Sequence, residues 1–546
     1  MKTPILGQSY VARSVNAADN RMVNMFPEVV TEGGLEAAFL NRAPGLSLLV
    51  TVGVGPIRGL WSHQISGTNA YCVSGTGFYK IDTSYVATYI GEVAGTGPVV
   101  FADNGAQIFI AANPLGYIYN QLTNVFAQIT DVDFTGCGTV TYLDGYFVYN
   151  EPDSQKIWIT SLLDGTSVQP LDFASAEGSP DGVVAVNSIH RELWVFGTDT
   201  TEVWYDSGAT DFPLTPIQGA FNEIGCIAPY SVVKLDNALF WLGNDPRGFG
   251  VVFKSNGYSA QRVSTHAIEY AIQNYGDISD AVAYSYQQEG HSFYVISFPT
   301  GNATWVYDVA TGAWHERASF VNGAFSRHQT NCQTNFQSTT VVGDYQNGNI
   351  YKFDLDVYAD NGSTQKWLRS WRALPVGQNN LKRTAQHSLQ LESESGVGLN
   401  LYPAYDSQDL ITEDGNIIVA EFVQGYLITE SGNQLTSELN DGYEPLVTIN
   451  WPEPYPNDYA LATNSYTEAP GYNPQAMLRW SDDGGHTWSS EHWTSMGKIG
   501  EYGYRTIWRR LGMTAKLRDR VYEISGTDPV KLSIMGAELI VTGTNA

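Results

Sequence analysis

Basic residues are scarce in this chain, and their scarcity narrows the range of partners that it can bind. Lysine and arginine number 29 against 56 aspartates and glutamates, which gives a formal net charge of −27 at pH 7. Tight binding of nucleic-acid phosphates needs clustered lysine and arginine, so the general surface of the chain is expected to repel DNA. Solubility explains the acidic excess equally well, because a net charge far from zero keeps a protein dispersed.

Cysteine and long apolar runs are also sparse. The four cysteines, none in a CxxC pair, predict buried free thiols in a protein made in a reducing cytosol. They are Cys72, Cys137, Cys226 and Cys332. The N-terminal stretch lacks the apolar core of a signal peptide, and no run of about 18 apolar residues occurs. We therefore expect neither a membrane span nor export by the usual signal.

Glycine and aromatic residues, by contrast, are abundant, with 54 Gly, 33 Tyr and 14 Trp in 546 residues. Tyrosine and tryptophan suit half-buried strands, and glycine suits tight turns. One stretch shows the resulting pattern well. Arg191–Phe196 alternates in polarity, Gly197–Thr200 turns the chain, and Glu202–Tyr205 runs back as a second strand. Composition and pattern together predict an all-β fold.

Similar hairpins recur at roughly 40–50 residues between about residues 59 and 354, which is the spacing of propeller blades. Seven such hairpins begin at Asn69, Gln107, Gly145, Arg191, Ala238, Ser292 and Thr340. A single hairpin cannot bury its own apolar face, so radial packing is the economical arrangement. We predict a β-propeller of six or seven blades, closed by strands from both ends of the repeat region. An array of β-sandwiches with chance similarity is the alternative.

Three regions are expected along the chain. Residues 1–50, broken by Pro27 and Pro44, predict an extended N-terminal arm that packs across the propeller or reaches a neighbouring subunit. Residues 51–365 are predicted to form the propeller, and residues 366–546 a C-terminal β-rich domain.

The C-terminal region also holds an acidic β-repeat insertion at about residues 404–475, in which LITEDGN and LITESGN lie 17 residues apart. The turns of this repeat carry Glu413, Asp414 and Glu430, and an outer solvated surface would explain these acidic residues. Helices are expected to be rare, with Ala267–Tyr275 the best candidate.

One short motif suggests glycan chemistry. The sequence contains one match to S-x-D-x-G-x-T-W, the Asp-box of sialidase-like propellers, formed by Ser481, Asp483, Gly485, Thr487 and Trp488. Hydrolysis would require an arginine cluster for the sugar carboxylate and a Tyr/Glu nucleophile pair, and the sequence offers no convincing arginine set. A single copy outside the expected propeller favours a self-sealed structural turn. A glycan-binding or glycan-cleaving propeller is therefore the alternative to a structural function.

Two carboxylate pairs, Glu177 with Asp181 and Asp482 with Asp483, could in principle serve a glycosidase, but capping or solvated carboxylates explain them better. A calcium loop is suggested by Asp354, Asp356, Asp360, Asn361 and Gly362. Its register fails, because Tyr358 and Gln365 occupy ligand positions of the EF-hand pattern.

His328 and Cys332 lie four residues apart without a second ligand pair, so a zinc site is not expected. No Walker, G-x-G-x-x-G or G-x-S-x-G motif occurs in a suitable context. The residues therefore predict no catalytic residue, no cofactor and no metal.

Long strings of this chain resemble the packaged-DNA stabilisation protein, or tail hub (nozzle), of short-tailed (podovirus) bacteriophages. The resemblance runs through Arg13–Ser14, Asn20–Arg21, Asn24, Phe26–Glu28, Pro44–Leu46, Gly55–Trp61, Asp172–Glu177, Arg191–Trp204, Gly225–Asp245, Arg262–Glu269, Tyr307–Arg317 and Leu517–Leu532. The length of these strings makes the match more specific than any short motif.

The resemblance implies a structural virion protein rather than an enzyme, placed in the virion tail after assembly in the host cytoplasm. It implies a homo-hexameric tube below the head-to-tail adaptor, with tail spikes or fibres at its side and a plug or needle below. Such a tube would retain packaged DNA and conduct double-stranded DNA without binding it tightly, and it would not insert into a membrane. If the acidic excess lines this DNA passage, the turns with Glu413, Asp414 and Glu430 are the best candidates for its wall, although an outer solvated surface is equally consistent.

Overall fold

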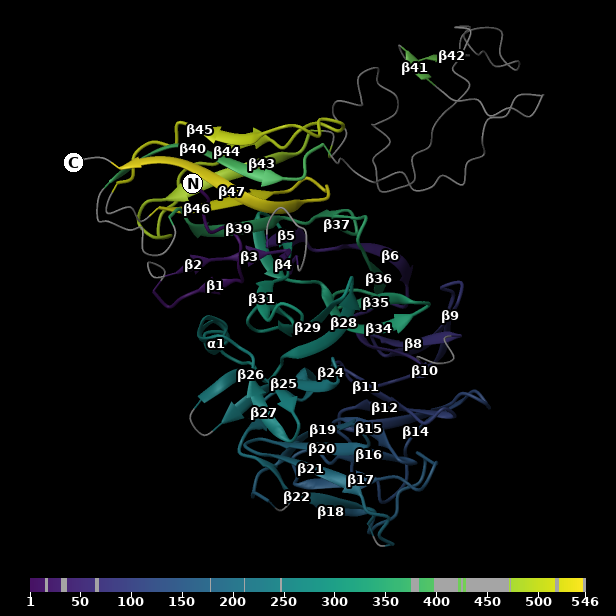
Figure 1. Ribbon diagram of the computed structural model, residues 1–546. Helices are drawn as coiled ribbons and strands as arrows, with labels where there is room; N and C mark the ends of the chain where they lie inside the picture. Colours follow the sequence, from purple (N-terminus) through teal and green to yellow (C-terminus); the bar gives the residue numbers. More distant parts are fainter. Residues whose placement is uncertain are drawn as a thin grey trace, which may run out of the picture.

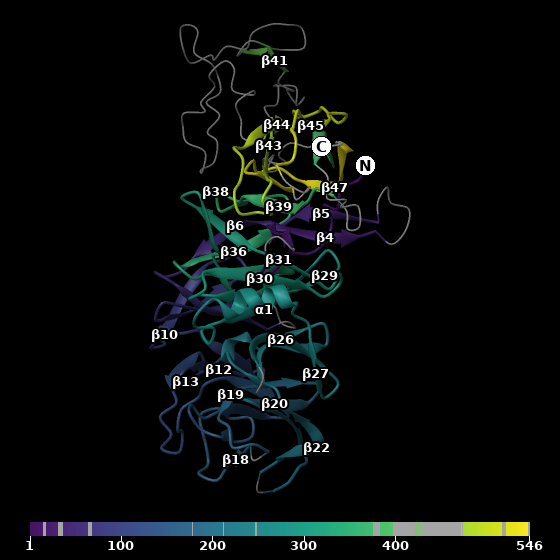
Figure 2. The same cartoon turned by 90° about the vertical axis from the view of Figure 1, so that its left-hand side faces the viewer.

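The computed structural model describes residues 1–14, 18–30, 37–63, 68–176, 178–210, 212–245, 248–374, 383–396, 471, 473–515 and 520–543, and strands at 421–423 and 426–428. Strands dominate these residues, and the one α-helix among them is α1 (His266–Gln273), at the expected place. A propeller forms one end of the molecule, and a sandwich of yellow C-terminal strands forms the other (Figure 1). Both chain ends lie at the sandwich (Figures 1 and 2).

Seven antiparallel sheets surround the propeller axis, one per blade. Blades 1 to 3 are β7 (Ile57–Ser62), β8 (Asn69–Ser74), β9 (Gly77–Asp82) and β10 (Ala87–Glu92); β11 (Val100–Asp103), β12 (Gln107–Ala112), β13 (Leu115–Asn120) and β14 (Val125–Gln128); and β15 (Val140–Leu143), β16 (Tyr146–Asn150), β17 (Lys156–Ile159) and β18 (Phe173–Ser175). Blades 4 and 5 are β19 (Val183–Ile189), β20 (Glu192–Gly197), β21 (Thr201–Asp206) and β22 (Leu214–Asn222); and β23 (Gly225–Cys226), β24 (Val233–Leu235), β25 (Ala238–Asp245), β26 (Gly248–Asn256) and β27 (Ser259–Arg262).

Blades 6 and 7 complete the ring. They are β28 (Val282–Gln288), β29 (His291–Phe298), β30 (Ala303–Asp308) and β31 (Ala313–Glu316); and β34 (Thr330–Phe336), β35 (Thr339–Asp344), β36 (Asn349–Asp354) and β6 (Gly45–Thr51). Strand β6 precedes blade 1 in the chain, yet it pairs antiparallel with β36, from Thr51 opposite Asn349 to Gly45 opposite Asp354. The two ends of the repeat region are thus hydrogen-bonded in one blade. Strand β6 crosses residue 50, where the arm was expected to end.

One hairpin in each of blades 3 to 7 has a two-residue turn in which both residues have positive φ; these hairpins are β15–β16, β19–β20, β24–β25, β28–β29 and β34–β35. These turns are Asp144–Gly145, His190–Arg191, Asp236–Asn237, Glu289–Gly290 and Gln337–Ser338. Positive φ at both positions defines the type I′ turn, whose twist matches that of the strands it joins. Between neighbouring blades the large side chains interlock, as Trp194 and Phe196 do with Trp241.

The sandwich consists of two sheets. One runs β4 (Met25–Val29), β5 (Ala38–Arg42), β47 (Ser533–Gly543), β40 (Thr384–Ser393) and β45 (Thr506–Arg509). The other runs β3 (Met22–Val23), β39 (Trp367–Arg372), β46 (Val521–Gly526), β43 (Gln475–Ser481) and β44 (His492–Ser495). Their shared core includes Met22 and Leu40 from the N-terminal region and Trp371, Tyr522 and Leu539 from the C-terminal region.

The propeller and the sandwich share a sheet. Strand β3 pairs in parallel with β31 of blade 6 through Val23 and Glu316, and antiparallel with β39 through Met22 and Arg369. Nine strands therefore form one continuous sheet across both domains. The expected N-terminal arm is an integral part of the sandwich and also supplies the outer strand of blade 7.

Short elements complete the described fold. They are β1 (Tyr10–Val11), β2 (Asp19–Asn20), η1 (Pro229–Ser231), β32 (Ala318–Val321), β33 (Ala324–Arg327), β37 (Ala359–Asp360), β38 (Ser363–Thr364), β41 (Glu421–Val423) and β42 (Tyr426–Ile428). Strands β41 and β42 pair with each other inside the expected insertion. Glu413, Asp414 and Glu430 lie outside the described residues, as does Glu177. Among the described helices, none has the length and apolarity to cross a membrane.

Candidate functional site

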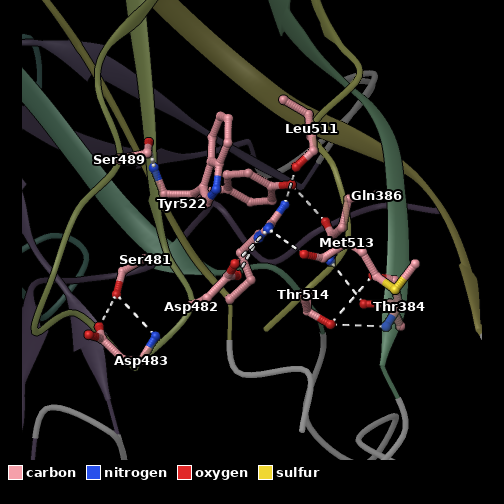
Figure 3. A network of polar contacts seen from close by, with 12 residues as sticks. Thr384, Gln386, Ser481, Asp482, Asp483, Ser489, Leu511, Met513, Thr514 and Tyr522 are labelled. Carbon is pink, nitrogen blue, oxygen red and sulfur yellow. Dashed lines mark hydrogen bonds and ion pairs between the residues drawn. The ribbon is translucent and has the colours of Figure 1, made fainter. Parts of the chain in front are cut away.

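The Asp-box forms a turn that closes on itself, beyond the C-terminal end of β43 (Figure 3). The Asp483 carboxylate accepts hydrogen bonds from the backbone N–H groups of His486 (3.0 Å) and Thr487 (2.9 Å) and from the hydroxyls of Ser481 and Thr487 (2.6 Å each). These bonds hold the pKa of Asp483 well below its usual range. The Ser481 hydroxyl also accepts from the N–H of Gly485 (2.8 Å), whose φ of +105° favours glycine. The turn therefore uses its carboxylate internally.

A buried arginine anchors this turn to the sandwich. Arg520, whose side chain is 1% exposed, forms a two-point ion pair with Asp482 at 2.7 and 2.8 Å. Its guanidinium also donates to the carbonyl of Leu511 and lies over the rings of Trp480 (5.2 Å) and Tyr522 (5.9 Å). Asp482 and Asp483 thus have separate partners, and both act as structural carboxylates in this turn.

Substituting Asp482→Asn is expected to lower the free energy of unfolding of the sandwich by about 2–4 kcal/mol, because the Arg520 charge would stay buried without a counter-charge. Urea denaturation followed by tryptophan fluorescence measures the change. Asp144→Asn is the matched control, since its partner Arg191 is 82% exposed and such pairs contribute at most about 1 kcal/mol. Equal effects of the two substitutions would contradict the anchoring role.

The other predicted carboxylates also stabilise local structure. Asp181 accepts from the N–H groups of Asp199 (2.8 Å) and Thr200 (3.0 Å), capping the turn between β20 and β21. Asp354 pairs with Lys352 at 2.8 Å. Asp360 is buried on β37, where it accepts from Gln365 and where burial raises its pKa to about 6.

Asn361 and Gly362, from the same predicted calcium loop, have φ of +50° and +80° and form the tight turn between β37 and β38. Asp356 donates its backbone N–H to Asp354 at 3.1 Å. Across the part of the chain that the structure describes, no three His, Cys, Asp or Glu side chains gather as a metal site.

His328 and Cys332 do not converge on a common point. His328 is buried with its Nδ1 at 2.7 Å from the Thr330 hydroxyl, whereas the Cys332 thiol lies 3.9 Å from the carbonyl of Ile57. All four cysteines are free thiols; Cys332 is half-buried and the other three are buried. Burial raises the pKa of the Cys226 and Cys332 thiols to about 12, so these groups are protonated at neutral pH.

Five residues at the junction of the propeller and the sandwich form what we call the seam: Arg21, Asn24, Arg42, Arg317 and Arg369. Asn24 donates to the carbonyls of Ala318 and Lys366, both at 2.8 Å, and so bridges the end of blade 6 and the start of the sandwich. Arg21 forms a two-point pair with Glu316 (2.9 and 2.8 Å). Arg369 is 1% exposed and donates to the carbonyl of Ile5 at 2.6 Å.

Arg42 has the densest set of contacts in the seam. Its guanidinium donates to the carbonyls of Tyr358 (3.0 Å), Gln365 (2.5 Å) and Val530 (3.0 Å), and to the side chain of Gln365 (3.2 Å). Burial lowers its pKa to about 10. Sequence reasoning missed Arg42 and Arg317. The alternation Trp367, Arg369, Trp371 was a usable signal, because all three prove buried.

His315 is a buried titratable group beside the seam. It is 0% exposed, and neither ring nitrogen has a hydrogen-bond partner among the described residues. Burial lowers the pKa of His315 to about 3, and the nearby charges of Arg317 and His291 act in the same direction. The Asp308 carboxylate opposes this shift, because its negative charge raises the pKa of His315. His315 therefore stays neutral in the folded protein down to about pH 3. In the unfolded chain the same imidazole takes up a proton below about pH 6.5.

The substitution His315→Leu is expected to make stability less sensitive to acid. The unfolded imidazole takes up a proton below about pH 6.5 and the folded one does not, so His315 costs up to about 1.4 kcal/mol per pH unit as the pH falls from 6.5 towards 3. Free energies of unfolding measured between pH 7 and 4 should fall less steeply in the variant. His190→Leu, at an exposed turn, should keep the wild-type slope. An unchanged slope in His315→Leu would refute this assignment.

Comparison with known proteins agrees with the two-domain architecture. Residues 1–358 match the family described as bacteriophage P22 Gp10, beta-propeller, and residues 461–542 match the one described as bacteriophage P22 Gp10, beta-sandwich. The chain belongs to the P22 Gp10 family. Its predicted fold class, a β-propeller followed by a β-rich domain, is confirmed, and so is its predicted resemblance to podophage tail hub proteins.

A curated relative and several solved structures are also similar. The tail hub protein gp10 of Salmonella phage P22 is 21% identical over 370 residues, which cover 61% of this chain and 74% of the relative. The match to the designed Ika8 protein covers 62% of this chain and 100% of the Ika8 chain, with 14% identity and a TM-score of 0.34. The match to virginiamycin B lyase from Staphylococcus aureus covers 57% of this chain and 98% of the lyase chain, with 10% identity and a TM-score of 0.40. Likenesses at these scores carry no functional information for this chain.

Proposed function

We propose that the protein is the tail hub, or nozzle, of a short-tailed phage virion. In this role it continues the channel of the portal and adaptor, retains packaged DNA, carries tail spikes or fibres and conducts DNA during ejection. The family match over both domains, together with the curated P22 relative, carries this proposal. The protein would be assembled in the host cytoplasm, reside in the virion tail and act without catalysis, cofactor, metal or membrane insertion.

The way in which the two domains are joined supports a mechanical role. A continuous nine-stranded sheet crosses from blade 6 into the sandwich, and the buried arginines of the seam add hydrogen bonds on both sides of the junction. Relative motion of the domains would break this sheet and leave buried donors unpaired, which is costly. A rigid body of this kind suits a component that transmits load between an adaptor and a tail fibre.

The dimensions of the propeller axis decide where DNA could pass. The axial cavity has a volume of about 520 Å³ and is lined by strands from all seven blades. Duplex DNA, whose major groove alone is about 12 Å wide, is too broad for such a passage. A channel for duplex DNA would therefore lie between several copies of the chain, as it would in the proposed homo-hexameric ring, with the adaptor above and a plug or needle below.

Electron microscopy of the purified chain, with and without its adaptor, tests this assembly. We expect rings with a central opening wide enough for a DNA duplex, either in the chain alone or on addition of the adaptor. A chain that stays monomeric in both preparations would refute the proposed hub. Release of sugar from host polysaccharide by the isolated chain would instead support the alternative glycan-cleaving function.

The net charge of −27 leads to a prediction for the lumen of the ring. An acidic wall keeps DNA hydrated and unbound, and its repulsion extends over about 8 Å at physiological ionic strength. Replacing carboxylates that face the lumen with lysine is expected to slow DNA ejection, because each new phosphate contact must break as the duplex moves. Ejection kinetics of the variant virions measure the effect. A strongly positive lumen in the assembled ring, or unchanged kinetics, would contradict it.

A further inference from the structure

The axial cavity of the propeller contains few charged groups, and their partners can be compared one by one. Of its lining residues, Arg58, Asp103 and Lys234 carry formal charge. Arg58 is 4% exposed and donates to the backbone carbonyls of Gly75 and Val93 at 3.0 Å, among others. Its guanidinium is thus committed to the protein's own backbone.

Asp103 is likewise engaged. Its carboxylate accepts from the side-chain amide of Gln121 at 3.0 Å and from the indole N–H of Trp61 at 3.4 Å. These two donors belong to blades 2 and 1, so Asp103 helps to hold neighbouring blades together. Asp103 and Arg58 are thus both bound to other groups of the protein. Lys234 is the third charged residue of the cavity lining.

Lys234 lies on β24 of blade 5. Its side chain is exposed to the cavity, and within the described residues its ammonium forms no ion pair and no hydrogen bond. The protein around it displaces water and lowers its pKa, as expected for a charge held among the blades without a counter-charge. An ammonium has three donors, so Lys234 offers unmet bonding capacity at the axis.

Neutral polar residues line the same cavity, and several of their side chains also lack a hydrogen-bond partner in the described structure. Asn187 of blade 4, Asn331 of blade 7 and Tyr142 of blade 3 contribute side chains to the lining, and no side-chain hydrogen bond to protein is formed by these three in the described structure. Ser285 of blade 6 donates to the backbone carbonyl of Lys234 at 2.9 Å, which fixes the strand that carries the lysine. One cation and several amide and hydroxyl groups therefore line the same axial cavity.

We propose that the axial cavity is a binding site for a small organic carboxylate, with Lys234 as its counter-ion and Asn187, Asn331 and Tyr142 as hydrogen-bonding groups. A cavity of about 520 Å³ falls within the usual range of small-molecule sites, about 300–1,000 Å³. Charge-assisted bonds from an ammonium to a carboxylate are stronger than neutral ones, and they gain further where protein has displaced water. A cavity of this volume cannot hold a polyanion as large as duplex DNA, so the site is separate from any genome channel.

Isothermal titration calorimetry of the full chain with succinate tests the site, at an ionic strength of about 0.15 M to screen the net charge. We expect saturable binding that weakens by about tenfold or more in Lys234→Met, the loss typical of a bond to a charged group. Lys254→Met, on β26 of the same blade but outside the cavity lining, is the matched control and should bind like wild type. Succinamide, which has the same shape without charge, should not bind detectably.

The absence of saturable binding to the wild-type chain would overturn the proposal, and so would equal affinities of wild type and Lys234→Met. Thermal unfolding of each variant establishes that it is folded before titration. Asn187→Ala provides a second route if Lys234→Met does not fold, with an expected weakening of about threefold to tenfold for the loss of a neutral hydrogen bond. This test needs no assembly partner, so its result is independent of the proposed hub function.

Discussion

Removal of residues 1–51 is expected to prevent both the propeller and the sandwich from folding. Strand β6 is the outer strand of blade 7, and β4 and β5 belong to one sheet of the sandwich, where Met25 and Leu40 lie in the core at 0% exposure. Without these strands, blade 7 would expose the edge of β36 and the sandwich would lose part of its core. Circular dichroism and thermal unfolding should show no cooperative transition in the truncated chain.

A nicked chain is the control for this truncation. A protease site placed between residues 31 and 36, which separate β4 from β5 in sequence, breaks the backbone but leaves every strand present. The nicked protein is expected to keep its cooperative transition, whereas the truncated one loses it. A truncated chain that still unfolds cooperatively at the wild-type temperature would show that the N-terminal strands are dispensable, contrary to their position in the structure.

Arg42→Met is expected to lower the free energy of unfolding by about 3–5 kcal/mol, because several buried carbonyls would lose their donor at a cost of about 1–3 kcal/mol each. Arg42 is 3% exposed, and its removal would leave the carbonyls of Tyr358, Gln365 and Val530 without this donor. These carbonyls lie on segments beside the propeller and within the sandwich, so the junction itself should weaken. Urea denaturation measures the loss of stability, and limited proteolysis near residues 355–366 measures opening of the junction.

Arg191→Met is the matched control for Arg42→Met. Arg191 also forms an ion pair, with Asp144 at 2.9 Å, but its side chain is 82% exposed at a propeller turn. Exposed pairs contribute at most about 1 kcal/mol, because water and salt screen them. If the two arginine substitutions were to shift the denaturation midpoint equally, Arg42 would not have the structural role assigned to it.

Much of the propeller could be predicted from local sequence. The alternation of Arg191–Phe196 and Glu202–Tyr205 corresponds to β20 and β21, and the seven hairpins correspond to seven blades. This worked because a strand's side chains alternate between its two faces, whatever the strand later packs against. The turn positions were less visible, since His190–Arg191 and Gln337–Ser338 adopt the type I′ geometry without the glycine that usually signals it.

The structural role of the Asp-box was also predictable, because its contacts are nearly all local. Ser481, Asp483 and Thr487 lie within seven residues, and the carboxylate reaches backbone N–H groups three and four residues away. By contrast, the anchoring of Asp482 by Arg520 spans 38 residues, and no pattern in the sequence connects the two. Local hydrogen bonds can be inferred from spacing, whereas a partner from another strand requires the sheet order.

The sequence by itself determined the all-β class, the blade hairpins, the acidic charge and the resemblance to the tail hub family, because each depends on short-range patterns or on the residues as written. Only the tertiary structure decided that residues 1–51 belong to both domains, that β3 joins blade 6 to the sandwich, and that Lys234 lines the axial cavity. These features depend on pairings between segments hundreds of residues apart. Such pairings are selected by the burial of whole sheet faces and by the matching of backbone donors to acceptors, which no local stretch of sequence specifies.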